Sequence, residues 1–492
     1  MPSMQSERAR YYTPLLACLL LACIVRLWLS LLPQSYWLDE TVTAFMVRYG
    51  IHHPSLAVAP KLDLSLYYWL PRASQALFGS SEASLRLPSL LATFVSLLLT
   101  ARLAARLIHP QAAWFVVFLC FLPHEFTRQA TDARPYGLGT CVALAAIWSL
   151  IRWLDRARLA DAALFCLFAA LLLRIHLIYW PFYAVFAVYA LLRCKRAETP
   201  VSGRALAIVS CIVAASLVPL VPDTLALSKQ AAMHVVVDKS QATSFLSAFQ
   251  LPMILACGLS GWLLARIFRW PRHPIATTLS GCILIALWWL WQPAALLAFS
   301  AITGNSVFVA RYFSLAIPGM ILAAALSLSA FVPPAKWQPL TLILAIGILL
   351  ASFAHGLAPP NRNSDWRDAA RTVNNLIRGT NTPVLCPSPF VEAQSPVWTP
   401  SYALPGFFYA HLAAYPIDGD TILLPARLSP EGERYVQPLI GSRIAPAGRF
   451  VLYSGVYGVY QWLSWLENQP ELNPWKKRHL KFGDVELIVF ER

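Results

Sequence analysis

Residues 11–32 read YYTPLLACLLLACIVRLWLSLL, and this apolar run decides the fold class. A helix needs about 20 apolar residues to cross a bilayer, whereas the apolar part of a cleaved signal peptide is shorter. Similar runs recur along the chain, in which 58% of the residues are hydrophobic, 13% are charged and the mean hydropathy is +0.55. The sequence therefore predicts a polytopic, all-α integral membrane protein whose first span stays as an anchor.

Basic residues indicate how the chain is oriented. Clusters of Lys and Arg recur at every second connection between apolar runs, and such loops face the cytoplasm. We expect about eleven spanning helices in a bacterial inner membrane, with a cytoplasmic N-terminus. This orientation accounts for the net charge of +15, and because no basic stripe is present, a nucleic-acid partner is not expected. The expected spans lie near residues 11–32, 86–107, 111–127, 136–153, 161–176, 178–192, 205–222, 247–268, 275–302, 312–331 and 338–356.

Two adjacent acids, Asp39 and Glu40, follow the first span in the stretch YWLDET. They open a loop, residues 33–85, that is too long for a simple connector. The loop carries two amphipathic stretches, at 39–53 and 64–78, as expected of helices that lie in the membrane interface. Asp39 has an ordinary alternative role, because an Asp just before a helix is a preferred N-cap. Its place at the membrane rim instead suits a catalytic base that acts on a lipid-soluble substrate.

Charge is dense in the short second outer loop, HEFTRQATDARPY, at residues 124–136. Its ordinary interpretation is a polar connector with snorkelling arginines. In a chain this apolar, the combination of Arg128, Asp132, Arg134 and Tyr136 also marks a candidate binding site.

Polar groups also interrupt the apolar runs. Arg311 stands at the outer start of a span, where the positive-inside rule disfavours it unless an anion binds there. Arg26, near the outer end of the first span, raises the same question. The stretch RIHLIYWP at residues 174–181 breaks a long apolar segment, so two spans must turn around His176. Polar groups at such a depth normally face a cavity.

The composition changes to that of a soluble domain near the end of the chain. Residues 364–373, SDWRDAARTV, place apolar residues on one face behind a capping acid, and Gly379 supplies a stop, which predicts an amphipathic helix. We therefore divide the chain into a transmembrane domain, residues 1–357, and a small extracytoplasmic α/β domain, residues 358–492. The strand-like runs of this second domain are 383–386, 449–453 and 485–490.

Motifs for cofactors are not found in the sequence. All ten cysteines except Cys386 lie in apolar stretches, and there is no CxxC spacing, so neither a disulfide framework nor a zinc site is predicted. The sequence also has no Gly-rich phosphate loop, HExxH or nucleophile elbow. No cofactor is therefore required, and a divalent metal is neither demanded nor supported by any ligand spacing.

The ordered motifs YWLDE (36–40), LYY (66–68), GSSEASLRLPS (79–89), DARPY (132–136), ARY (310–312) with Pro318, and DWR (365–367) resemble those of membrane glycosyltransferases of the GT-C superfamily. The most similar groups are the protein O-mannosyltransferases and the lipid A aminoarabinose transferases. The match in order and spacing is good over about the first 140 residues and looser beyond them. Such proteins often have His-Pro-Pro before Leu-Tyr-Tyr, where this chain reads Asp63-Leu64-Ser65.

The resemblance implies an inverting transfer of a sugar from a polyprenyl-phosphate donor to a hydroxyl acceptor on an envelope glycan, lipid or protein, at the outer side of the membrane. It implies Asp39 as the base, with Glu40 as its partner. A leaving phosphate needs fixed cations, for which Arg134 and Arg311 are the candidates. Weaker donors to that phosphate are Tyr136 and His176, and supporting residues are Asp132, Arg128, Tyr67 and Tyr68.

Two alternatives stay open. A non-enzymatic transporter or binder of polyprenyl-phosphate lipids would use the same outer arginines, although no paired half-sequences suggest alternating access. A glycan ligase or polymerase with a diphosphate donor would be a related enzyme. The identities of the sugar and the acceptor depend on the shape of the cavity and of the outer loops, which the sequence does not define.

Overall fold

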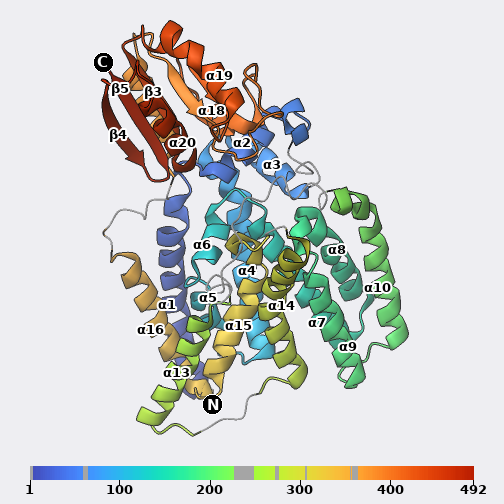
Figure 1. Ribbon diagram of the computed structural model, residues 1–492. Helices are drawn as coiled ribbons and strands as arrows, with labels where there is room; N and C mark the ends of the chain where they lie inside the picture. The colour runs from blue at the N-terminus through green and yellow to red at the C-terminus, as the bar shows by residue number, and fades with distance from the viewer. Residues whose placement is uncertain are drawn as a thin grey trace. The chain divides into compact units, whose positions relative to one another are not determined.

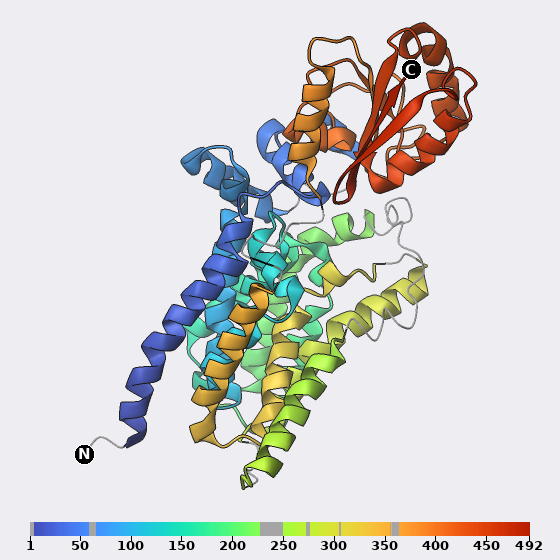
Figure 2. The same cartoon turned by 90° about the vertical axis from the view of Figure 1, so that its left-hand side faces the viewer.

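The computed structural model describes residues 4–58, 65–226, 249–271, 276–304, 307–354, 356 and 364–492 (Figures 1 and 2). The chain forms two compact units. The helical unit contains Met1–Leu32, Leu64–Tyr67 and Arg86–Pro359, and the mixed unit contains Pro33–Asp63, Tyr68–Leu85 and Pro360–Arg492. Most of the first loop thus folds with the C-terminal region.

Long apolar helices make up the helical unit. Within the described residues, seven helices are long and apolar enough to cross a membrane, and two shorter apolar helices accompany them. The chain is an integral membrane protein, as predicted. Helix α7 packs on α8, and α15 packs on both α13 and α14. The helices are α1 (Met4–Leu27), α4 (Glu82–Leu107), α7 (Tyr136–Arg156), α8 (Leu159–Ile175), α9 (Phe182–Lys195), α10 (Gly203–Leu217), α13 (Leu251–Ile267), α14 (Leu279–Thr303), α15 (Ala316–Ser329) and α16 (Trp337–Ser352).

The run at residues 111–127, expected as one span, forms two short helices instead. Helix α5 covers Ala112–Leu119, and α6 covers His124–Thr131. Pro123 lies between them in an extended conformation. A proline lacks the N–H of a helical residue and disfavours helical geometry in the residue before it, so one helix does not continue through this point. The polar residues expected in a connector therefore lie largely on a helix of their own.

Basic clusters expected in cytoplasmic loops meet at one end of the helical unit. Asp155, in the last turn of α7, accepts from Arg106 Nη2 (2.8 Å) at the end of α4 and from Arg193 Nη2 (3.0 Å) at the end of α9. Arg152 Nε lies 3.0 Å from Asp161 Oδ1. Because three helix ends share one acid, their basic clusters lie on the same side, which agrees with the alternation of basic loops in the sequence.

The interruption expected at residues 174–181 is present. Helix α8 ends at Ile175, His176 is extended, and the short 3-10 helix η5 (Leu177–Tyr179) leads to α9. Ser65 Oγ donates to the carbonyl of Ile175 (2.6 Å), which supplies a partner at the end of α8. The segment with His176 is therefore a defined turn between two helices.

A five-stranded sheet forms the core of the mixed unit, in the order β2-β1-β3-β5-β4. Strand β1 pairs in parallel with β2 and β3, while β5 pairs antiparallel with β3 and β4. The sequence predicted β1, β3 and β5 and missed the two edge strands. The strands are β1 (Val384–Pro387), β2 (Thr421–Leu424), β3 (Arg449–Gly455), β4 (Lys476–Phe482) and β5 (Val485–Glu491).

Helices cover both faces of this sheet (Figure 1). On one face, Leu452 of β3 belongs to a buried cluster with Trp462 of α20. On the other face, the ring of Tyr453 lies 5.8 Å from those of both Trp366 in α17 and His411 in α18. Neighbouring strand residues point to opposite faces, which is why adjacent side chains serve different layers. The helices are α17 (Trp366–Ile377), α18 (Ala410–Ala414), α19 (Pro430–Leu439) and α20 (Val456–Glu467).

Two helices of the first loop, α2 (Leu38–Tyr49) and α3 (Trp69–Phe78), complete the mixed unit. Helix α2 packs on α18, where Arg48 Nη1 donates to the carbonyl of Ala413 (3.1 Å). Nearby, the backbone N–H of Phe407 donates to Ser55 Oγ (3.0 Å). The acidic dipeptide is therefore carried on a helix that packs against the C-terminal region.

Candidate active site

Helix α2 begins at the acidic dipeptide. Trp37 is the N-cap residue, and its backbone N–H donates to Glu40 Oε2 (3.2 Å). This is the acidic half of a capping box, and it uses Glu40, whose side chain is fully buried. Asp39 is half-buried and is the second residue of the helix. The alternative role of Asp39 as the N-cap is therefore wrong, because the capping bond is made by Glu40.

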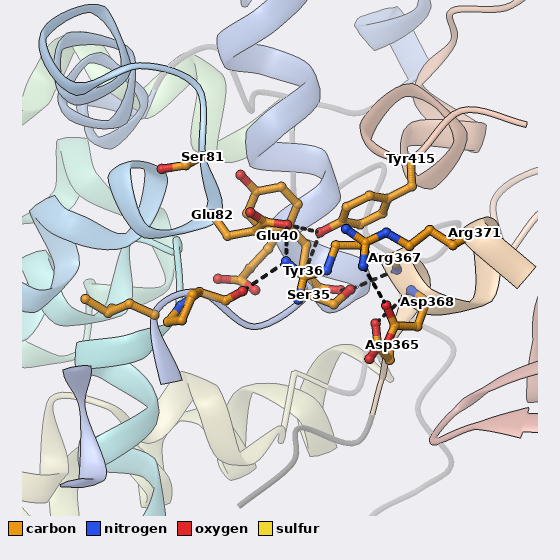
Figure 3. Close-up of polar contacts among 12 residues, drawn as sticks. Ser35, Tyr36, Glu40, Ser81, Glu82, Asp365, Arg367, Asp368, Arg371 and Tyr415 are labelled. Atoms are coloured by element: carbon orange, nitrogen blue, oxygen red, sulfur yellow. Dashed lines mark hydrogen bonds and ion pairs between the residues drawn. The ribbon is translucent and has the colours of Figure 1, made fainter. Parts of the chain in front are cut away.

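The chain just before α2 is bound to distant residues (Figure 3). The backbone N–H of Tyr36 donates to Tyr415 Oη (2.9 Å), and the two ring centroids are 5.8 Å apart. Tyr415 Oη donates to Glu82 Oε1 (3.0 Å), which also accepts from Arg367 Nη1 (3.1 Å). Tyr415 follows α18, Glu82 opens α4 and Arg367 lies in the first turn of α17. All four residues belong to the mixed unit.

Cations and aromatic rings gather around His176 in the helical unit. Arg134 and Arg311 are far apart in the sequence, and each has a tyrosine close by, Tyr136 two residues after Arg134 and Tyr312 directly after Arg311. The ring of Tyr136 lies 5.9 Å from that of His176. Tyr312 completes the group, with ring centroids 5.8 Å from His176 and 6.4 Å from Tyr136, and with the Arg311 guanidinium 5.5 Å from its ring. The structure thus brings together the four residues predicted to bind a donor phosphate.

Hydroxyl groups fix the backbone of Arg134. Ser89 Oγ donates to the carbonyl of Arg134 (3.2 Å), and the Tyr67 and Ser89 hydroxyl oxygens lie 3.0 Å apart. Tyr67 is fully buried, so its hydroxyl is held in place by the surrounding helices. Tyr67, predicted as a supporting residue, therefore reaches Arg134 through Ser89. Tyr68, predicted in the same role, is buried in the mixed unit.

The other two supporting residues form a turn at the end of α6. Asp132 is buried, with its carboxylate 3.5 Å from Arg128 Nε. The carbonyl of Asp132 accepts the backbone N–H of Arg134 (2.8 Å). This ion pair joins Asp132 to a residue one helical turn away, and the backbone of Asp132 shapes the turn that carries Arg134.

Sequence reasoning missed the residues that hold the segment with Arg311. Gln292 Nε2, from within α14, donates to the carbonyl of Tyr312 (2.8 Å), and Trp288 Nε1 donates to the carbonyl of Leu315 (2.6 Å). Both side chains are buried. The available signal was an uncharged amide inside an apolar run, since a buried polar side chain in a spanning helix requires a partner.

Arg26 has a structural role in the helical unit. Its Nη2 atom donates to the carbonyls of Ser352 and Gly356 (both 2.9 Å), and its guanidinium lies 4.5 Å from the centroid of the Phe353 ring. These acceptors lie at and beyond the end of α16, where helix carbonyls lack intrahelical partners. These contacts explain why the first span contains an arginine, so an anionic ligand is not needed to explain it.

The candidate residues fall into two groups. The acids Asp39 and Glu40 belong to the mixed unit, and the cations Arg134 and Arg311 belong to the helical unit. Over the described ranges, no group of three or more His, Cys, Asp or Glu side chains is placed to hold a metal ion. The two arginines are positive charges that the helical unit offers to an anion.

Comparisons with known proteins bear on the fold and the family. Residues 65–222 match the family described as dolichyl-phosphate-mannose-protein mannosyltransferase. No curated protein matches the chain in sequence. The fold is similar to that of ArnT from Cupriavidus metallidurans, both bound to undecaprenyl phosphate and in the apo state, each with a TM-score of 0.55 and 12% identity over 97% of this chain and 98% of the other. The resemblance to GT-C membrane glycosyltransferases is thereby confirmed.

Proposed function

We propose that the chain transfers a sugar from a polyprenyl-phosphate donor to a hydroxyl acceptor. The observation that carries the proposal is that the segment with Arg134 and Tyr136 meets the segment with Arg311 and Tyr312 at His176 in the helical unit. Guanidinium groups bind phosphate oxygens through paired N–H donors, and two of them together suit a phosphate better than a neutral ligand. A protein of similar fold, ArnT, has been solved bound to undecaprenyl phosphate, which supports this class of donor.

The phosphate is the leaving group of the reaction. The acceptor oxygen forms a bond to the anomeric carbon while the bond from that carbon to the phosphate oxygen breaks, and the electron pair of the broken bond stays on the phosphate. Negative charge grows there, so cations fixed in advance lower the barrier. Arg134 and Arg311 are the proposed cations, with Tyr136 and His176 as further donors. A phosphate monoester of a lipid leaves without being protonated.

Asp39 is the proposed base. The acceptor hydroxyl loses its proton as it attacks, and one placed carboxylate is enough to take that proton. Because Glu40 closes the first turn of α2, the two acids have separate tasks, with Asp39 on the acceptor and Glu40 on the helix. A single displacement inverts the anomeric configuration.

We place the reaction at the outer side of a bacterial inner membrane. In this topology the N-terminus and the basic ends of α4, α7 and α9 are cytoplasmic, and the C-terminal region is extracytoplasmic. Helices α2 and α3 lie in the membrane interface, and about eleven segments cross or enter the bilayer, with the shorter helices counted. The arginines can neutralise the phosphate, so the proposed mechanism does not require a metal.

The test uses the full chain in lipid nanodiscs with a panel of radiolabelled undecaprenyl-phosphate hexoses and an extract of cell-envelope acceptors. One donor of the panel is expected to give chain-dependent transfer of label to a glycolipid, glycan or glycoprotein, identified by mass spectrometry, with an inverted anomeric bond. Binding of every donor without any chain-dependent product would favour a lipid transporter or binder. Transfer from undecaprenyl-diphosphate sugars alone would favour a ligase or polymerase.

A further inference from the structure

The segment that leads into the acidic dipeptide is held by residues hundreds of positions away. The carbonyl of Pro33, the hydroxyl of Ser35 and the N–H of Tyr36 each meet a group of Arg367 or Tyr415. Tyr36 and Tyr415 are 379 positions apart in the chain. Three attachment points within four residues are unusual for a loop, because most loop backbone bonds are local or made to water.

The hydroxyl group of Tyr415 both accepts and donates a hydrogen bond. The oxygen accepts the backbone N–H of Tyr36, and the proton is donated to Glu82. Burial raises the pKa of Tyr415 well above its usual range, so the hydroxyl keeps its proton and remains a donor. Tyr415 therefore bridges the chain entering α2 and the first residue of α4.

Arg367 also holds this segment (Figure 3). Its backbone N–H donates to Ser35 Oγ (3.1 Å), and its Nη1 atom donates to the carbonyl of Pro33 (3.0 Å) and to Glu82 Oε1 (3.1 Å). One guanidinium nitrogen carries two hydrogens in fixed directions, so it serves two acceptors at once. Because Glu82 accepts from both Arg367 and Tyr415, the three side chains form one connected network.

Ordinary packing of α17 does not require these contacts. Trp366, Ala369 and Val373 are buried on the apolar face of the helix. Arg367 lies off that face, and its hydrogen bonds go to the first loop. Arg371, one turn later, pairs with Asp368 of its own helix (3.2 Å). The distinction between the two arginines indicates a task for Arg367 beyond the stability of α17.

We propose that Arg367, Tyr415 and Glu82 are positioning residues for Asp39. They fix the backbone up to Tyr36, and the hydrogen bond from the Trp37 N–H to Glu40 fixes the first turn of α2. The backbone is therefore held on both sides of Asp39. The C-terminal region thus sets the place of the base. This proposal rests on the proposed function, in which a base must meet an acceptor oxygen in line with an anomeric carbon. A misplacement of about 1 Å in such a geometry costs about 100-fold in rate.

The test compares Tyr415→Phe and Arg367→Met with matched controls in the full chain, in nanodiscs, using the labelled undecaprenyl-phosphate hexose that supports transfer. We expect kcat to fall about 10- to 100-fold while KM for the donor stays within about threefold. Arg367→Lys should recover part of the loss, because an ammonium group reaches at least one of the acceptors. Rates are divided by the number of undecaprenyl phosphate molecules bound per chain, so that unfolded protein does not imitate the effect.

The controls are Tyr460→Phe and Arg371→Met. Tyr460 also donates to a carboxylate of the mixed unit, that of Glu486 (3.2 Å), and Arg371 is an exposed residue of α17. Both controls should keep kcat within about twofold of the wild type. The double variant Tyr415→Phe with Glu82→Gln should lose less than the sum of the two single losses, because both residues belong to one network.

Hydrogen exchange separates this proposal from the proposed function. Backbone amides of residues 36–49 should exchange faster in Tyr415→Phe and Arg367→Met than in either control. If these amides respond but no form of the chain transfers sugar, the anchoring stands and the transferase assignment falls. If the wild type transfers sugar and both variants keep its kcat, the transferase stands and the positioning role is overturned.

Discussion

The two groups of candidate residues are held by different kinds of contact. In the helical unit, Arg134 is fixed by the hydroxyl of Ser89, and the segment with Arg311 by neutral side chains of α14. In the mixed unit, the segment before Asp39 is fixed by the charged pair of Arg367 and Glu82. Charged contacts are costly to bury in an apolar surrounding, whereas neutral hydrogen bonds are less so. If the proposed roles hold, binding of the phosphate depends on helix packing, and placement of the base depends on the C-terminal region.

Substitutions in the two groups should therefore affect different steps, and Asp39→Asn should cause the largest loss of transfer activity. An amide cannot take the proton of the acceptor, so kcat should fall by about 100- to 10,000-fold. Binding of undecaprenyl phosphate should not change, because the proposed phosphate ligands lie in the helical unit. Transfer and binding are measured on the same nanodisc preparation, with Asp368→Asn, an exposed position in α17, as the control. Near-normal transfer by Asp39→Asn would remove the base assignment.

Arg134→Ala and Arg311→Ala should instead weaken binding of the lipid phosphate. Hydrogen bonds to charged groups contribute about 1.5–3 kcal/mol, so each variant should weaken the binding of undecaprenyl phosphate by about 10- to 100-fold. Arg102→Ala, at an exposed position near the basic end of α4, is the matched control. Unchanged affinity in both variants would return these arginines to the snorkelling interpretation and would leave the helical unit without a phosphate site.

Much of the fold could be predicted from the sequence, because apolar periodicity and turn residues are local signals. Helix α17 and the break at His176 are examples. Strand β4 could not be predicted from the sequence, because Lys476–Phe482 is an exposed edge strand with few apolar residues. The split of residues 111–127 was missed because length and hydropathy outweighed a single proline in the prediction.

The site could be predicted in part. Arg134 and Arg311 stood out because charges are rare at the outer end of apolar runs. Their meeting at His176 depends on helix packing, which the sequence does not specify. The anchoring of Tyr36 by Tyr415 left no signal at all, because nothing in a tyrosine after a short helix indicates a partner 379 positions away. Such contacts follow from tertiary structure alone.

We expect the stability of the mixed unit to depend on pH. His411 is fully buried against Trp366 and Tyr453, neither ring nitrogen has a hydrogen-bond partner among the described residues, and burial lowers the pKa of His411 to about 3. The unfolded chain has a histidine pKa of about 6.5, so between these values it takes up a proton that the folded chain does not. The free energy of unfolding should therefore fall by up to about 1.4 kcal/mol per pH unit below pH ~6.5.

Substitution of His411 by leucine should remove this slope. The measurement is the urea concentration at which half of the mixed unit is unfolded in the full chain. Unfolding is monitored through hydrogen exchange of the β3 and β5 amides, and the measurement is repeated from pH 7 to pH 4. His479→Leu, at an exposed position of β4, is the control and should keep the slope of the wild type. Equal slopes in all three proteins would mean that another group, rather than His411, governs the acid response of this unit.

Glu40→Gln should give the smallest effect, and it separates the two acids. The glutamine oxygen accepts the Trp37 N–H as the carboxylate does, and glutamine is itself common at this place of a capping box. What is lost is the interaction of a negative charge with the N-terminus of α2, about 0.3–1 kcal/mol, so kcat should fall by less than about tenfold. Glu40→Ala, which removes the acceptor, should destabilise α2 by about 1 kcal/mol, seen as faster exchange of its first amides. If Glu40→Gln were instead as inactive as Asp39→Asn, the proton would pass through Glu40, and the separation of tasks between the two acids would be wrong.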